Sequence, residues 1–145
     1  MPRQAATAVW EGGLREGKGS FSVATGTLKG VYSFPSRFGD GAPGQTSPEE
    51  LIAAAHASCL SMALSAGLEK AGATPTRIET RAVCTIEKVG DAFRVTRMEL
   101  TVRGTVPGLT LEQFRKAAAD AKQGCPISNA LSDKIEVTLD ADLVQ

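Results

Sequence analysis

Polar and apolar positions alternate along three short segments in the first 34 residues, and a period of two predicts β-strands. Gly12-Gly13 and Thr25-Gly26 separate the segments and suit hairpin turns. A stretch rich in Gly and Pro follows at 39–46 and is typical of a loop. The start of the chain therefore predicts a β-meander. Its segments are 5–10, 18–24 and 27–34.

A long helix is predicted next, because Ser47 can act as N-cap, Pro48 suits the first helical position, and Glu50 completes an S-x-x-E capping box. Apolar residues then recur at steps of three and four until the pattern stops near Gly72. The helix would span roughly 24 residues, or ~36 Å. Its many Ala, Ser and Gly positions allow another helix or sheet to approach closely, so we expect it to be central.

The second half of the chain returns to alternation, switches to helical spacing, and ends in alternation again. The order of elements predicts an α+β fold with an antiparallel sheet, to which the meander, the middle hairpin and the last strand contribute. The predicted elements are a hairpin of 77–88 and 93–106, a helix over 109–123, a short helix from Cys125 to Leu131, and a strand over 134–143.

Composition narrows the class of protein. A length of 145 residues with 42% hydrophobic and 22% charged residues is typical of one soluble domain, 1–145. Sixteen basic and sixteen acidic residues cancel, so the chain lacks the positive potential on which nucleic-acid binding depends. We recognise neither a signal peptide nor a run of about 20 apolar residues, so we expect a cytoplasmic protein without a membrane partner.

Three cysteines in a reducing compartment are not expected to form a structural disulfide framework. Cys59 lies within the long helix among small apolar residues, where a core role is the plain interpretation. Cys125 lies at a predicted helix start, where backbone N–H groups favour the thiolate, although a structural N-cap is equally compatible. Cys84 falls on the apolar face of a strand, and we interpret it as a core residue.

Two adjacent carboxylates at the helix start have different positions around its axis. Glu50 is about 180° from Cys59, whereas Glu49 is about 80° from it. Ten residues of rise still separate Glu49 from Cys59 by about 15 Å. If Glu49 serves Cys59, it must therefore come from another subunit, and two antiparallel copies of this helix related by C2 symmetry would create two such sites.

His56 is the only histidine and is three residues before Cys59, so a hydrolytic Cys-His pair is conceivable. Against this, such nucleophiles usually lie where free backbone N–H groups bind an oxyanion, and those groups are occupied in mid-helix. A zinc site of Cys59, Cys125 and His56 would lack the close ligand pairs typical of structural zinc.

Several motifs occur together along nearly the whole chain. They are the run from Ser47 to Cys59, Ser61 to Leu64, Gly124 to Ser128, Arg37-Phe38, Trp10-Glu11-Gly12 and Gly17-Lys18-Gly19. In combination they resemble the motifs of the OsmC family. Within that family, Arg37 just before the loop and the His56-Ala57 pair resemble the OsmC branch more than the organic hydroperoxide resistance branch.

This resemblance implies an intertwined homodimer, a peroxidatic Cys59, a resolving Cys125, and an activating Arg37 oriented by Glu49. A mid-helix thiol lacks help from the helix dipole, so a guanidinium held by a carboxylate would suit it. The implied enzyme is a cysteine-based peroxidase that reduces organic hydroperoxides, and hydrogen peroxide more weakly, without a cofactor or a metal.

In the implied cycle, a Cys59 sulfenic acid condenses with Cys125, and a dithiol reopens the disulfide. The family suggests lipoylated or thioredoxin-like proteins as the donor. The alternative is a non-catalytic, stress-related binding module with inert cysteines. Apolar residues near the cysteines would favour alkyl or fatty-acid hydroperoxides, although each of them alone is better explained by core or dimer contacts. They are Phe38, Leu51, Ile52, Leu60 and Met62.

Overall fold

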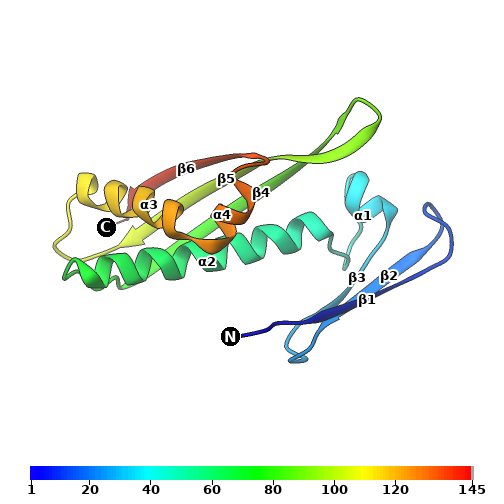
Figure 1. Ribbon diagram of the computed structural model, residues 1–145, viewed down its shortest axis with the longest axis horizontal. Helices are drawn as coiled ribbons and strands as arrows, with labels where there is room; N and C mark the ends of the chain where they lie inside the picture. The colour runs from blue at the N-terminus through cyan, green and yellow to red at the C-terminus, as the bar shows by residue number, and fades with distance from the viewer. Residues whose placement is uncertain (145) are drawn as a thin grey trace. The chain divides into compact units, whose positions relative to one another are not determined.

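A computed structural model describes residues 1–144 (Figure 1). The chain forms two compact units, one over Met1–Leu51 and one that begins at Ile52. A single functional domain over 1–145 therefore stays a prediction. The elements in chain order are β1 (Ala6–Glu11), β2 (Lys18–Val23), β3 (Lys29–Tyr32), α1 (Phe34–Phe38), α2 (Pro48–Lys70), β4 (Arg77–Val89), β5 (Ala92–Thr105), α3 (Leu111–Gly124), α4 (Pro126–Leu131) and β6 (Glu136–Leu143).

The predicted β-meander is confirmed as an antiparallel sheet in the order β1-β2-β3. The rings of Trp10 and Tyr32 lie 5.6 Å apart and close over Gly19. A Cβ at Gly19 would lie 2.5 Å from the Tyr32 ring, so only glycine fits there.

Helix α1 was not predicted, because its single turn is too short to produce a helical period. Ser33 was expected in a strand, yet its backbone N–H donates to the Ser36 hydroxyl at 2.8 Å as half of a capping box. Pro35 in the first turn favours the helical φ. Arg37 lies in the last turn of this helix.

The first unit lacks a hydrophobic core of its own. Among residues 1–51, all of which the structure describes, only Gly19 and Glu49 are buried. All six residues of β1 are exposed, including Val9 and Trp10. A three-stranded sheet gains its stability from an apolar face packed against another element.

The long helix is confirmed as α2. The Ser47 hydroxyl accepts the Glu50 N–H at 3.1 Å as predicted, but the Glu50 carboxylate accepts from the Thr46 hydroxyl, so the expected reciprocal half of the capping box is replaced. Gly72 ends the segment with a φ of +83°. Among the residues described, α2 is the one helix long and apolar enough to cross a membrane, a criterion that core helices of soluble proteins also meet.

The α+β class is confirmed, but the structure corrects the sheet. Strands form two three-stranded sheets, β1-β2-β3 and β4-β5-β6. Strands β4 and β5 are antiparallel as predicted, whereas β6 pairs with β5 in parallel. The two helices between β5 and β6 carry the chain back along the sheet before β6 begins, which a parallel pair requires.

The core of the second unit lies between the β4-β5-β6 sheet and helices α2 and α3 (Figure 1). Phe114 of α3 is fully buried against Gly104 of β5, where an added Cβ would lie 2.5 Å from the ring. This close contact seats α3, and with it the Cys125 that follows, over the sheet. The largest buried apolar side chains are Leu60, Leu64, Leu68, Met98, Leu100, Val102 and Phe114.

Candidate active site

Two cysteines that lie 66 positions apart in the sequence meet in the second unit. Cys59 is in the middle of α2, and Cys125 follows α3 and forms the N-cap of α4. Their Sγ atoms are 2.9 Å apart. Cys125 is fully buried, whereas Cys59 is half-buried. The arrangement places the sulfur of a half-buried cysteine directly against that of a fully buried one.

The surroundings of the pair separate the two thiol pKa values. Burial raises the pKa of Cys59, and its hydrogen bond to Cys125 raises it further. Burial also opposes ionisation of Cys125, but donors from Cys59, from the Ser128 and Ile127 backbone and from the Ser128 hydroxyl outweigh it, so the pKa of Cys125 is lowered. Either thiol can donate to the other; these donors favour Cys59 as donor and Cys125 as thiolate. This agrees with the expectation that the start of α4 stabilises a thiolate.

A buried histidine is hydrogen-bonded to a buried serine near the start of α4, the helix that Cys125 caps. His56 is fully buried on α2, and its Nε2 lies 2.6 Å from Oγ of Ser128, the third residue of α4. His56 Nδ1 has no hydrogen-bond partner among the described residues. Burial, with a smaller contribution from the positive charge of Lys122, lowers the pKa of His56. The imidazole is therefore neutral at neutral pH and is not hydrogen-bonded to Cys59, which disfavours the Cys-His hydrolytic pair.

Sequence reasoning assigned no role to Ser128. The Cys-Pro-x-Ser spacing could have indicated one, because the third residue of a helix lies near the N-cap on the same side. Its partner His56 lies 72 positions earlier, a separation that only the fold reveals.

Arg37 and Glu49 form a two-pronged ion pair in the first unit. Arg37 Nε lies 3.1 and 3.3 Å from the two carboxylate oxygens of Glu49, and its Nη2 lies 2.9 Å from Oε1. The Glu49 side chain is only 7% exposed, while that of Arg37 is 39% exposed. Arg37 also lies 4.9 Å above the Phe38 ring. Glu49 thus fixes the guanidinium plane and leaves part of it accessible.

The other residues singled out from the sequence divide between core and surface. Leu60 is fully buried, and Ile52 is partly buried and packs against the core cluster that includes Leu60. Met62 is 75% exposed. Cys84 is half-buried and packs against the core, as predicted. Among residues 1–144, no group of three His, Cys, Asp or Glu side chains could hold a metal ion.

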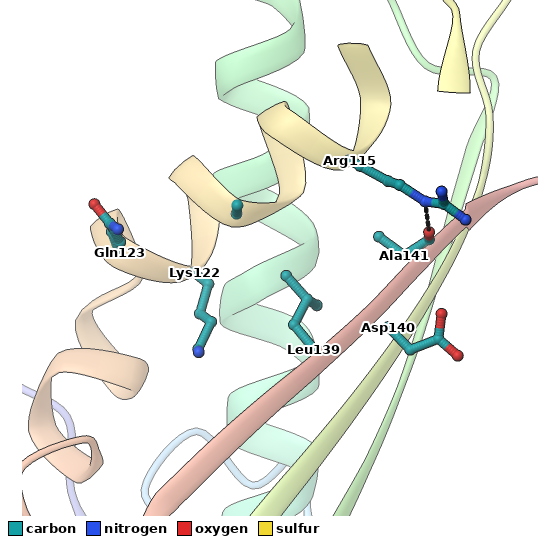
Figure 2. A pocket seen from close by; sticks show the side chains of 7 residues that line it. Arg115, Lys122, Gln123, Leu139, Asp140 and Ala141 are labelled. Carbon is teal, nitrogen blue, oxygen red and sulfur yellow. Dashed lines mark hydrogen bonds between the residues drawn. The ribbon is translucent and has the colours of Figure 1, made fainter. Parts of the chain in front are cut away.

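A separate hollow of about 540 Å³ lies between α3 and β6 (Figure 2). Arg115 crosses its rim, and its Nε donates to the Ala141 carbonyl at 3.1 Å. Lys122, which lowers the pKa of His56, also lines it. None of the four residues predicted for the site, Cys59, Cys125, Arg37 and Glu49, lines this hollow.

The long helix of this α+β chain brings one cysteine against a second cysteine at the start of a short helix. This pair of thiols defines the class of protein as a dithiol protein. Comparison with known proteins is more specific. The sequence model of the family described as OsmC-like protein matches residues 39–140. Peroxiredoxin OsmC of Escherichia coli is 46% identical over 137 residues, which cover 94% of this chain and 93% of that protein.

Two further relatives come from the organic hydroperoxide resistance branch. The organic hydroperoxide resistance protein of Xanthomonas axonopodis pv. citri is 30% identical over 128 residues, 88% of this chain and 87% of that protein. The crystal structure of an organic hydroperoxide resistance protein from Elizabethkingia anophelis is 26% identical, covers 99% of this chain and 98% of its own, and has a TM-score of 0.76. The chain belongs to the OsmC-like protein family.

Proposed function

We propose that this protein is a thiol-dependent peroxidase that reduces organic hydroperoxides through Cys59 and Cys125. The observation that carries the proposal is the 2.9 Å separation of the two sulfurs, one half-buried and one fully buried. Membership of the OsmC-like family and the names of its relatives, a peroxiredoxin and organic hydroperoxide resistance proteins, support the same activity.

In the first step, the Cys59 thiolate attacks the hydroperoxide ROOH. A sulfur–oxygen bond forms and the oxygen–oxygen bond breaks, so Cys59 becomes a sulfenic acid and the leaving alkoxide takes a proton to become the alcohol. In the second step, the Cys125 thiolate attacks the Cys59 sulfur. The hydroxide that leaves takes up a proton to become water, and a dithiol later reduces the disulfide.

The first step needs a cation at Cys59, because burial and the neighbouring Cys125 both raise its pKa. Arg37 is the proposed activator, and Glu49 is the residue that orients it. Glu49 is ten residues before Cys59 on the continuous helix α2, which corresponds to about 15 Å of rise. We therefore assign the activating pair at each Cys59 to Arg37 and Glu49 of the partner subunit in a homodimer.

Exposed apolar residues support a dimer. The first unit buries no apolar side chain among its described residues 1–51, and Trp10, Val9 and Val31 remain accessible. Helix α2 also exposes Met62. A second copy that covers these surfaces would supply the core that the N-terminal sheet lacks. A protein that is monomeric in analytical ultracentrifugation and fully active as a peroxidase at the same concentration would contradict this assignment.

The proposed substrates, electron donor and cellular compartment are those that suit this reaction. The substrates are alkyl or fatty-acid hydroperoxides, and hydrogen peroxide is a weaker substrate. The electron donor is a lipoylated or thioredoxin-like protein, whose vicinal dithiol can reopen the disulfide. The protein acts in the reducing cytoplasm as an antioxidant during oxidative stress, without nucleic-acid or membrane partners.

The test is single-turnover consumption of cumene hydroperoxide by the reduced protein without any donor. We expect one equivalent to be consumed per chain, Cys59→Ser to abolish consumption, and Cys84→Ser, the matched thiol control, to leave it unchanged. Equal consumption by Cys59→Ser, or none by the parent, would contradict the proposal; the second outcome would favour a binding module with inert cysteines.

A further inference from the structure

The proposed cycle leaves one buried polar pair without a role. His56 and Ser128 come from different helices, are both almost fully shielded from solvent, and are hydrogen-bonded at 2.6 Å. Burying polar groups in an apolar core is costly unless they are satisfied, yet His56 Nδ1 has no partner among the described residues. The pair is therefore a poor choice for stability alone, and its position against Cys125 suggests a role in the chemistry.

We propose that His56 positions the Ser128 hydroxyl as a donor to the Cys125 sulfur, and that this donor chain prepares Cys125 to close the disulfide with Cys59. The inference rests on the proposed peroxidase cycle and assigns two further residues to its second step. In this inference Ser128, three residues after Cys125 at the start of α4, donates to a reacting sulfur and is the catalytic residue, whereas His56 acts through Ser128 and is a positioning residue.

The donor direction of the hydrogen bonds from His56 through Ser128 to Cys125 follows from the tautomer of His56. A buried N–H without an acceptor is rarer and more costly than a buried lone pair without a donor. Since Nδ1 is the atom without a partner, the neutral ring carries its proton on Nε2. Nε2–H then donates to Ser128 Oγ, and the Ser128 hydroxyl is left to donate to Cys125, the bond that contributes to the lowered pKa of that thiol.

This series of hydrogen bonds requires the His56 ring to stay neutral. Burial and the positive charge of Lys122 on α3 lower its pKa, so the ring does not compete for the proton of Cys125. Among the described residues, the titratable groups that act on His56 and Cys125 are Lys122 of α3 and the Cys59 thiol of α2. The Cys125 thiolate is thus held by neutral donors, which leave its electron pair available for attack on the Cys59 sulfenic acid.

The first measurement is an equilibrium titration that does not depend on peroxidase activity. In full-length protein with Cys59→Ser and Cys84→Ser, Cys125 is the only thiol, and its ionisation is followed by thiolate absorbance. Ser128→Ala removes a donor to a charged acceptor and should raise the titration midpoint by about one pH unit. His56→Phe should shift it in the same direction, whereas Ser128→Thr, which keeps the hydroxyl, should restore it.

The second measurement follows disulfide closure in the otherwise unchanged protein after one equivalent of cumene hydroperoxide, by acid quench and intact mass. At a pH below the Cys125 titration midpoint of the parent, Ser128→Ala and His56→Phe should slow closure about tenfold, since a one-unit rise of the midpoint lowers the thiolate fraction about tenfold there. Formation of the Cys59 sulfenic acid should be slowed less than closure, because neither His56 nor Ser128 is hydrogen-bonded to Cys59. The matched control is Ser58→Ala, because Ser58 is an exposed residue of α2 whose hydroxyl donates to the Ala54 carbonyl at 2.7 Å.

Unchanged titration midpoints in Ser128→Ala and His56→Phe would overturn the inference. This holds even if both variants lost thermal stability, because a pair with a structural role alone would change the stability and leave the Cys125 midpoint where it is. Equal slowing of sulfenic acid formation and closure would also overturn it. If the parent protein formed no disulfide, the peroxidase proposal would fail separately, and the titration would still decide whether His56 and Ser128 act on Cys125.

Discussion

Replacement of Cys125 by serine tests the second step of the proposed cycle most selectively. The substitution keeps the size of the side chain and its place at the N-cap of α4, but it removes the sulfur that attacks Cys59. We expect the variant to consume a first equivalent of hydroperoxide like the parent. Its Cys59 sulfenic acid should then persist and react with a second hydroperoxide to give the irreversible sulfinic acid.

The size of the effect follows from the geometry of the pair. A disulfide bond is about 2.05 Å long, so sulfurs at 2.9 Å need to approach by only about 0.9 Å. Groups held this close react with effective concentrations far above 1 M. A second hydroperoxide at about 1 mM competes at least about a thousandfold less well. Overoxidation of the parent should therefore be slower than that of Cys125→Ser by about three orders of magnitude or more at ~1 mM hydroperoxide.

The assay is intact-mass analysis of reduced protein that is incubated with excess cumene hydroperoxide, without a donor, and quenched over time. Cys125→Ser should gain about 32 Da for a sulfinic acid, while the parent should stop at a loss of about 2 Da. Cys84→Ser should behave as the parent does. Equal rates of sulfinic acid formation in the parent and in Cys125→Ser would refute the reasoning, because Cys125 would then not protect Cys59.

Three further predictions concern activation, packing and pH. Arg37→Lys keeps the charge but loses the two-pronged contact with Glu49, and it should slow single-turnover hydroperoxide consumption at least about tenfold with little change in Tm, as stopped-flow and thermal melts can check. Gly104→Ala places a Cβ 2.5 Å from the Phe114 ring, and it should destabilise the fold by about 1–3 kcal/mol in urea unfolding. The pKa of His56 is lower in the folded protein than in the unfolded chain, so on acidification the unfolded chain binds the proton first. The stability that depends on a neutral His56 is therefore complete above about pH 6.5 and is lost as the pH falls towards the pKa of His56 in the folded state. His56→Gln should flatten that part of the stability profile in melts at about pH 7.5 and about pH 5.5, and an identical slope would contradict the assignment.

The elements with a strong period and clear boundary residues could be predicted from the sequence. Helix α2 was delimited by Ser47 and Gly72, and the β4–β5 hairpin by Gly90, which has a φ of +62°. These signals are local, since each depends on the conformation of a few neighbouring residues. The two cysteines were also found, although neither motif on its own distinguished chemistry from packing.

The features that were missed depend on contacts between distant parts of the chain. The direction of β6 relative to β5 is set by how α3 and α4 pack, and alternation within β6 is the same in either direction. The bond between His56 and Ser128 joins two helices and has no local pattern. Helix α1 was missed because one turn capped by two serines carries almost no period.

The most direct test of the central claim is intact-mass and peptide-mass analysis of the reduced parent protein after one equivalent of organic hydroperoxide. We expect a loss of about 2 Da that maps to a bond between Cys59 and Cys125. An unchanged mass with the hydroperoxide unconsumed, or a disulfide that involves Cys84 instead, would contradict the account.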